Sequence, residues 1–298
     1  MNVHTLERNP SNNENSNRIV NEYQTTNNNE ISNNRNIKIS NSSSSSIRCI
    51  DSSIYKLKSF CTIILIINAI IYIFELLYHY SFTKKTWICT LYNFGAKDTY
   101  SIVHHSQIYR FITPVFLHAS IIHIIMNSLS IVFLGYFLEI KIGTLKIIIL
   151  YITSGIISTI FSATLNKKSI SVGASGAIMG FSGLLIVDFL LTCSKMNESQ
   201  KSNFILFAIM TAINLGGTNI GKDGNKIDNY AHLFGFITGA CLSVFLLKDT
   251  VDVQHIKKSL LTILKIILGI CLASGTIFCL IYLFYIGKIP INSLRDIC

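Results

Sequence analysis

Long polar and apolar blocks follow one another along the chain. The first 53 residues contain 14 Asn and 11 Ser with almost no apolar periodicity, whereas seven apolar stretches occupy most of the remainder. Each stretch is close to the roughly 17–25 residues that an α-helix needs to cross a bilayer. The pattern predicts seven membrane-spanning helices, at Phe60–Tyr80, Ser120–Glu139, Leu145–Thr164, Gly173–Cys193, Asn203–Ile220, Asn229–Leu247 and Leu260–Ile286.

The same pattern predicts the domain organisation. Residues 1–55 cannot bury enough apolar surface to offset the entropy lost on ordering, so we expect a disordered cytosolic tail there. Residues 56–250 hold the first six stretches and form the predicted core. Residues 251–298 are expected to supply a linker, the seventh helix and a short C-terminal tail. The expected fold is an all-α polytopic membrane protein, a six-helix bundle with one additional C-terminal transmembrane helix.

Composition and charge agree with a membrane protein. Of the 298 residues 50% are hydrophobic and only 13% are charged, whereas about a quarter of a soluble domain is charged. The net charge of +10 is spread between the apolar stretches instead of forming one stripe, which favours a role in membrane topology over nucleic-acid binding. More Lys and Arg fall on the side of the tail, so the N-terminus is predicted to be cytosolic.

The eight cysteines indicate no metal chemistry. They contain no CxxC pair, and four of them lie inside apolar stretches, where Cys behaves as a small hydrophobe. We therefore expect neither a disulfide framework nor a zinc site. No cofactor is expected either.

The connector between the first two stretches is unusually long and aromatic. Residues 81–119 include Trp87, Tyr92, Phe94, Tyr100, Tyr109, Phe111 and Phe116. A loop of this length and content is expected to pack on the bundle or to enter the membrane interface.

Ser175 and His232 are the strongest candidates for chemistry. Ser175 opens the fourth stretch within Gly173–Ala177, and His232 opens the sixth, with glycines three and seven residues after it. The fourth stretch carries a similar stripe of glycines, and such stripes let two helices pack closely. If the stripes pack, the two side chains come within hydrogen-bonding reach, and the imidazole can activate the hydroxyl as a nucleophile.

A third, acidic member of this group is hard to find. Asp188 follows Ser175 by 13 residues, which is roughly 20 Å along a helix. Glu75 and Glu139 lie toward the ends of their stretches and have no reason to meet His232. A dyad therefore fits the sequence better than a triad.

His123 and Asn127 are polar residues on one face of the second stretch, because they are four residues apart. Polar side chains inside membrane helices mark function by default. They also serve as hydrogen-bonded bridges between helices. From the residues alone, both interpretations stay open.

The chain resembles the rhomboid intramembrane serine proteases in a series of short motifs that follow one another along the sequence. The similarity covers roughly Lys56 to Leu247. Its elements are Tyr109-Arg110 with Thr113, Phe116 and His118; His123-x-x-x-Asn127; Gly135, Glu139 and Gly143; Gly173-Ala174-Ser175-Gly176; and Ala231-His232-x-x-Gly235-x-x-x-Gly239. Each element is common alone, but the set in this order is very specific.

The resemblance implies a rhomboid-like bundle and a set of roles. Ser175 would be the nucleophile and His232 the general base. The oxyanion hole would consist of the Ser175 backbone N–H with the side chains of His123 and Asn127. The seventh helix resembles the eukaryotic secretase-type arrangement, and this layout together with the Asn-rich composition looks apicomplexan.

Further positions match or depart from the family pattern. Arg110, His118 and Glu139 match positions that tie down the long loop and the cytosolic turn. Tyr109 stands where the family often has tryptophan. Met179 stands where members commonly have a tyrosine that stacks under the catalytic histidine, so His232 is expected to be oriented more loosely.

The expected function is that of an intramembrane serine endopeptidase, which cleaves single-span membrane proteins within or next to their transmembrane helix. The expected partners are such substrates, surface adhesins among them, and the lipid bilayer. The expected location is the plasma membrane or a secretory-pathway organelle. Two alternatives stay open: a catalytically inactive rhomboid-like adaptor that binds membrane helices, and a transporter, which would predict internal repeats.

Overall fold

A computed structural model describes residues 59–82, 86–216, 228–247, 258–286 and 298. In this part of the chain every regular element is a helix. Six continuous helical runs are long and apolar enough to cross a membrane: α2 (Phe60–Phe82); α5 (Ile121–Ser130) with η3 (Ile131–Gly135) and α6 (Tyr136–Ile142); α7 (Thr144–Leu165); α8 (Ser175–Thr192); α10 (Asn229–Leu246); and α11 (Lys258–Ile281) with η7 (Tyr282–Ile286). The predicted fold class, an all-α polytopic membrane protein, is confirmed.

α9 (Glu198–Gly216) occupies the region of the fifth predicted stretch. It packs on α5 and α8, but its hydropathy falls below that of the six apolar runs. Its hydropathy is lower because the helix begins at Glu198 instead of the predicted Asn203, and its first turns are polar. They include an ion pair of 2.8 Å between Glu198 and Lys201. The end of the predicted stretch, at 217–220, lies outside the described residues, as do the tail at 1–58 and the linker at 248–257.

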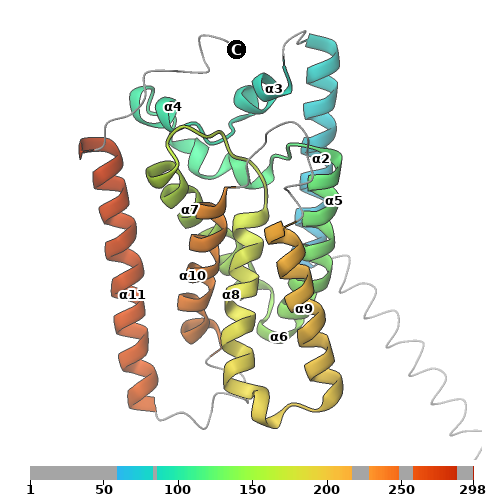
Figure 1. Ribbon diagram of the computed structural model, residues 1–298, viewed down its shortest axis with the longest axis vertical. Helices are drawn as coiled ribbons and strands as arrows, with labels where there is room; N and C mark the ends of the chain where they lie inside the picture. Colours follow the sequence, from blue (N-terminus) through green and yellow to red (C-terminus); the bar gives the residue numbers. More distant parts are fainter. Residues whose placement is uncertain (1–58, 83–85, 217–227, 248–257, 287–297) are drawn as a thin grey trace, which may run out of the picture. The chain divides into compact units, whose positions relative to one another are not determined.

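α8 lies at the centre of the bundle (Figure 1). It packs most extensively against α10 and α7, and α11 lies against α7 and α10 at the edge of the bundle. The core is built from side chains of α2, η3, α7 and α8, among them Leu134, Leu150 and Phe181, which are fully buried. The outer faces of α2 and α11 expose large apolar side chains, as a lipid-facing surface requires.

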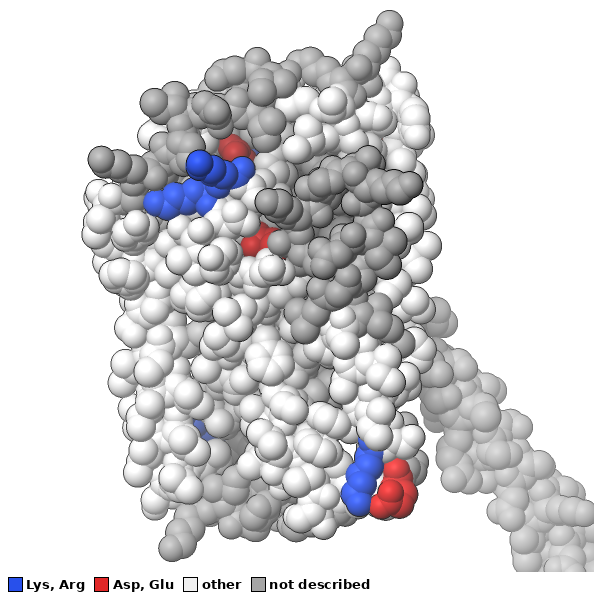
Figure 2. All heavy atoms as spheres, in the orientation of Figure 1, with Lys and Arg blue, Asp and Glu red and all other residues white. Residues whose placement is uncertain are grey.

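Charged side chains follow the same layout. On the face drawn in Figure 2, those that are described lie toward the two ends of the bundle, and most of the band between them is formed by other residues. At one end, the Glu139 carboxylate accepts the backbone N–H groups of Phe60 at 2.8 Å and Cys61 at 3.1 Å. It also accepts the hydroxyl of Thr144 at 2.8 Å, so it joins the start of α2 to the turn between α6 and α7.

The long connector packs on the opposite end of the bundle (Figure 1), as its aromatic content predicts. It contains α3 (Trp87–Phe94), α4 (Thr99–His104), η1 (Ile108–Phe111) and η2 (Thr113–Phe116). Arg110 is buried and donates from Nη1 to the carbonyl oxygens of Tyr92 at 2.8 Å and Ala96 at 2.7 Å. Its guanidinium also lies 4.4 Å from the centre of the Tyr92 ring. Arg110 therefore fastens η1 to the end of α3.

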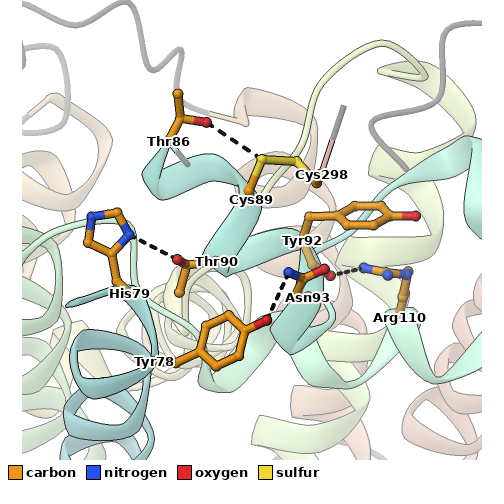
Figure 3. Close-up of a disulfide and its surroundings, with 9 residues drawn as sticks. All are labelled: Tyr78, His79, Thr86, Cys89, Thr90, Tyr92, Asn93, Arg110 and Cys298. Carbon is orange, nitrogen blue, oxygen red and sulfur yellow. Dashed lines mark hydrogen bonds between the residues drawn. A yellow bond between two sulfur atoms is a disulfide. The ribbon is translucent and has the colours of Figure 1, made fainter. Parts of the chain in front are cut away.

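A disulfide joins this connector to the C-terminal end of the sequence, which corrects the expectation that the cysteines would not pair. Cys89 in α3 and Cys298 are bonded across 209 residues (Figure 3). Neither cysteine lies in an apolar stretch. A pairing this distant leaves no local spacing pattern, and for that reason the sequence did not reveal it.

Candidate active site

Ser175 and His232 meet at the interface of α8 and α10. The hydroxyl oxygen of Ser175 and the Nε2 atom of His232 lie 2.9 Å apart. Ser175 is the first residue of α8, and His232 lies in the first turn of α10. Both helices begin at the end of the bundle that the long connector covers (Figure 1). Because a helix N-terminus presents N–H groups without intrahelical partners, backbone donors lie beside the hydroxyl.

Glycines bring the two helices together, as their spacing predicts. A β-carbon at Gly235 would overlap the carbonyl oxygen of Gly176, and one at Gly239 would overlap that of Gly180. Likewise, a β-carbon at Gly183 would overlap the carbonyl oxygen of Phe236. α8 and α10 are therefore in backbone contact, and this contact sets Ser175 and His232 at the same depth.

His123 and Asn127 lie beside the segment that leads to Ser175. Gly173, two residues earlier, has a φ of +127°, and its N–H donates to the carbonyl oxygen of Pro114 at 2.8 Å. A β-carbon at this residue would lie 2.7 Å from Nε2 of His123 and 3.5 Å from Nδ2 of Asn127. Glycine is required here both by its φ and by this close approach.

The hydrogen bonds of these two side chains decide what they can donate. Nδ1 of His123 accepts the backbone N–H of Ala119 at 3.4 Å, so in the neutral imidazole the proton resides on Nε2, which faces Gly173. Nδ2 of Asn127 is buried and has no hydrogen-bond partner among the described residues. Two N–H donors are thus available beside the serine-bearing segment.

The imidazole of His232 makes no hydrogen bond to a carboxylate among the described residues. Its Nδ1 atom is buried without a hydrogen bond in this part of the chain. Two of the three carboxylates weighed from the sequence are engaged elsewhere, since Asp188 binds Lys141 at 2.7 Å and Glu139 holds the start of α2. The third, Glu75, is buried in α2 and makes no hydrogen bond to the imidazole among the described residues. Within the described ranges, the geometry is that of a serine–histidine pair without a third acidic member.

Two residues near this pair were missed by sequence reasoning. Asp228 is the N-cap of α10, four residues before His232, and it lies 3.7 Å from the buried ammonium of Lys97. Lys97 lies in the long connector and resembles an ordinary loop lysine in the sequence. The Asp three residues before Ala231 is a recognisable N-cap signal, but its ion pair leaves no trace in spacing.

Two further residues singled out from the sequence, His118 and Met179, are buried. His118 lies between η2 and α5, and its ring centre is 5.4 Å from that of His123. Burial, together with the neighbouring imidazole of His123, lowers the pKa of His118 to about 3, so it is neutral at physiological pH. Met179 is buried one turn after Ser175 on α8.

The sequence matches known proteins over about half of the chain. Residues 105–249 match the Rhomboid domain. The chain is 39% identical over 158 residues to RHOMBOID-like protein 6, mitochondrial, from Arabidopsis thaliana. The aligned residues are 53% of this chain and 50% of that protein. It is 30% identical over 146 residues to Rhomboid-like protease 3 from Toxoplasma gondii, and these residues are 49% of this chain and 54% of that protein.

A bacterial relative is similar over a stretch of comparable length. Rhomboid protease GluP from Bacillus subtilis is 33% identical over 150 residues, which are 50% of this chain and 28% of that protein. The chain spans about half the length of the plant and Toxoplasma relatives named above. With its domain match, its relatives and its all-helical membrane fold, the chain belongs to the rhomboid family.

Proposed function

We propose that this protein is an intramembrane serine endopeptidase that cleaves single-span membrane proteins within or next to their transmembrane helix. The observation that carries the proposal is the 2.9 Å contact between the Ser175 hydroxyl and Nε2 of His232, inside a bundle of apolar helices. A serine hydroxyl is a weak nucleophile until a neighbouring base takes its proton, and a neutral imidazole at this distance supplies that base.

The first half of the reaction forms an acyl-enzyme. Nε2 of His232 takes the hydroxyl proton while the Ser175 oxygen attacks the scissile carbonyl carbon. The oxyanion that develops accepts hydrogen bonds from the Ser175 backbone N–H, from Nε2 of His123 and from Nδ2 of Asn127. His232 then donates its proton to the leaving amine as the peptide bond breaks. In the second half, His232 takes a proton from water as the water oxygen attacks the acyl carbon. It returns this proton to the Ser175 oxygen as the ester bond breaks, which releases the carboxylic acid product and restores the serine hydroxyl.

Substrate chemistry follows from the position of the site. The carbonyl groups in the interior of a membrane helix are hydrogen-bonded within the helix, so a segment there must unwind before Ser175 can attack it. Glycine lowers the cost of unwinding because it has a low helix propensity, and the small side chains of Gly, Ala and Ser let the segment approach the site closely. We therefore expect such residues near the cleavage site.

The disulfide supports an orientation of the protein in its membrane. Disulfides persist in oxidising compartments and are rare in the cytosol. Cys89 and Cys298 lie at the end of the bundle that carries the long connector, where α8 and α10 also begin (Figure 1). We infer that this end faces the lumen or the cell exterior and that the start of α2 faces the cytosol, in the plasma membrane or a secretory-pathway organelle.

Co-expression with candidate single-span proteins tests the proposed activity. The wild type should release a soluble fragment from at least one candidate, and Ser175→Ala should release none. Ser182→Ala is a matched control, because Ser182 is also a buried serine of α8 but bonds the Thr211 hydroxyl at 2.8 Å instead of His232. Equal cleavage by the wild type and Ser175→Ala would contradict the proposal, and binding without cleavage by both would favour an inactive adaptor.

A further inference from the structure

We propose that Lys97 and Asp228 form a positioning pair that holds His232 in register with Ser175. The pair joins three parts of the chain that lie far apart in sequence: the long connector, the segment that precedes Ser175, and the first turn of α10. The inference rests on the proposed function, because it concerns the residues that orient the proposed general base.

Asp228 fixes the turn of α10 that carries His232. Its Oδ1 atom accepts the backbone N–H of Ala231 at 3.2 Å, and its carbonyl oxygen accepts the backbone N–H of His232 at 3.1 Å. Its Oδ2 atom accepts the hydroxyl of Ser162 in α7. A displaced Asp228 would therefore shift the base directly, over a distance of one helical turn.

Lys97 supplies the anchor for this carboxylate. Its side chain is fully buried, and its ammonium lies 3.7 Å from Oδ2 of Asp228. The ammonium donates to the Ser162 hydroxyl at 3.0 Å, to the Asn166 carbonyl oxygen at 3.0 Å and to the Ser169 hydroxyl at 3.2 Å. All three N–H groups of the ammonium thus have acceptors, and Ser162 bridges the two charges.

The backbone of Lys97 reaches the other half of the site. Its N–H donates to the carbonyl oxygen of Ser171 at 3.0 Å, and the N–H of Ser171 donates back at 3.4 Å. Ser171 lies two residues before Gly173 and four before Ser175. One residue therefore holds the segment that leads to the serine with its backbone and the cap of the histidine helix with its side chain.

The energetics favour positioning over stabilisation as the role of this pair. Burial lowers the pKa of Lys97 to about 8, against the opposing effect of Asp228, so the ammonium form predominates at pH 7. Burial opposes ionisation of Asp228, but the charge of Lys97 and the hydrogen bonds of Ser162, Ser171 and Ala231 hold its pKa below the ordinary value. A buried ion pair rarely repays its desolvation cost, whereas its geometry is well defined because few arrangements satisfy both charges.

The test uses full-length protein in liposomes and the variants Lys97→Met, Asp228→Asn and the double variant. Asn keeps a side-chain oxygen that can cap α10 but loses the charge. We measure kcat and KM for a cleaved single-span substrate, and the rate at which a fluorophosphonate labels Ser175. The kcat and the labelling rate are expressed per folded molecule. Both single variants should lose between about 10-fold and about 10²-fold in kcat and in labelling rate, because a small misplacement of a catalytic group has this effect. KM should change by less than about twofold.

Two further variants keep the test sharp if a single variant folds poorly. Ser162→Ala removes only the bridging hydroxyl and should give a smaller loss of kcat. Asp98→Asn is the matched control: Asp98 is the neighbour of Lys97, is buried, and caps α4 through the Ser101 N–H at 2.9 Å. It should keep the kcat of the wild type. The double variant should lose no more than the worse single variant, since the two residues act as a unit.

A purely structural pair would give a different result. In that case Lys97→Met and Asp228→Asn would lower the melting temperature and keep the kcat of the wild type per folded molecule, which would overturn the inference. If Ser175→Ala is inactive while the pair variants keep full rate, only this inference fails. If Ser175→Ala is as active as the wild type, the proposed function itself fails.

Discussion

Gly173 lies so close to His123 that a β-carbon at residue 173 would be 2.6 Å from the Cε1 atom of the imidazole. Gly173→Ala should therefore displace the imidazole from the site, and it also places alanine at a φ of +127°. Loss of one oxyanion donor typically lowers kcat by about 10²–10³-fold, and we expect a loss of this size. Steady-state kinetics per folded molecule measure it.

Gly143→Ala is a control that distinguishes the close approach to His123 from the strain of placing alanine at a positive φ. Gly143 also has a positive φ, of +91°, but a β-carbon there would have no neighbour within 4 Å in the part of the chain that the structure describes. This variant should lose stability and keep the kcat of the wild type. Equal kcat losses in the two variants would show that backbone strain, not the approach to His123, explains the effect of Gly173→Ala.

Gly235→Ala should separate α8 from α10. Even a methyl group at Gly235 overlaps the carbonyl oxygen of Gly176, so the helices must move apart and the Ser175–His232 contact must lengthen. We expect both a lower melting temperature and a lower kcat.

The control for this change is Gly275→Ala in α11. Its β-carbon would make an ordinary contact, 3.5 Å from the ring of Phe161. Alanine in a helix interior is more favourable than glycine by roughly 0.5–1 kcal/mol, so this variant should be as stable as the wild type or slightly more stable. Wild-type stability and kcat in Gly235→Ala would contradict the backbone contact of α8 and α10.

Asn127→Ala distinguishes the two interpretations of this residue. As an oxyanion donor it should lower kcat by about 10²–10³-fold, with little change in melting temperature, because Nδ2 has no partner to lose among the described residues. As a bridge between helices it would instead lower stability and leave kcat per folded molecule unchanged. Thermal unfolding and initial rates of the same preparation decide between them.

The sequence predicted most of the helices and the meeting of Ser175 with His232. Long apolar runs bound the membrane helices because a bilayer imposes their length. The glycine stripes after both residues predicted which faces pack, since backbone contact tolerates no larger side chain. The spacing of residues within each helix was therefore enough to predict much of the candidate site.

Long-range pairings could not be predicted in this way. Lys97 and Asp228 are 131 positions apart, Cys89 and Cys298 are 209 apart, and nothing near either member marks its partner. The extent of α9 was also mispredicted at its start, because a helix with polar first turns does not stand out in an apolar pattern. Charged residues and cysteines outside the apolar stretches can pair with any of several partners, and only the folded structure shows which partner each one meets.

His118 should make the protein sensitive to acid. Burial, and then the neighbouring imidazole of His123, lowers its pKa to about 3, whereas an unfolded histidine titrates near 6.5. As the pH falls from about 6.5 to about 3, the unfolded chain therefore binds a proton that the folded protein does not, and the free energy of unfolding decreases by up to about 1.4 kcal/mol per pH unit.

His118→Phe removes this titration, so its free energy of unfolding should depend less on pH in the same window. Unfolding in detergent micelles between about pH 4 and about pH 7 measures both slopes. The slopes are compared instead of absolute stabilities, because the substitution itself alters packing. Identical slopes for the wild type and His118→Phe would show that the titration of His118 does not cause the acid sensitivity.

Fluorophosphonate labelling tests the proposed dyad most directly, because it requires an activated serine and no knowledge of the substrate. The labelled residue is identified by mass spectrometry in the wild type and in His232→Ala. We expect labelling at Ser175 in the wild type and a rate lower by about 10²–10⁴-fold in His232→Ala, the contribution typical of a general base. Labelling of another serine, or equal rates at Ser175 in the two proteins, would contradict the proposed mechanism.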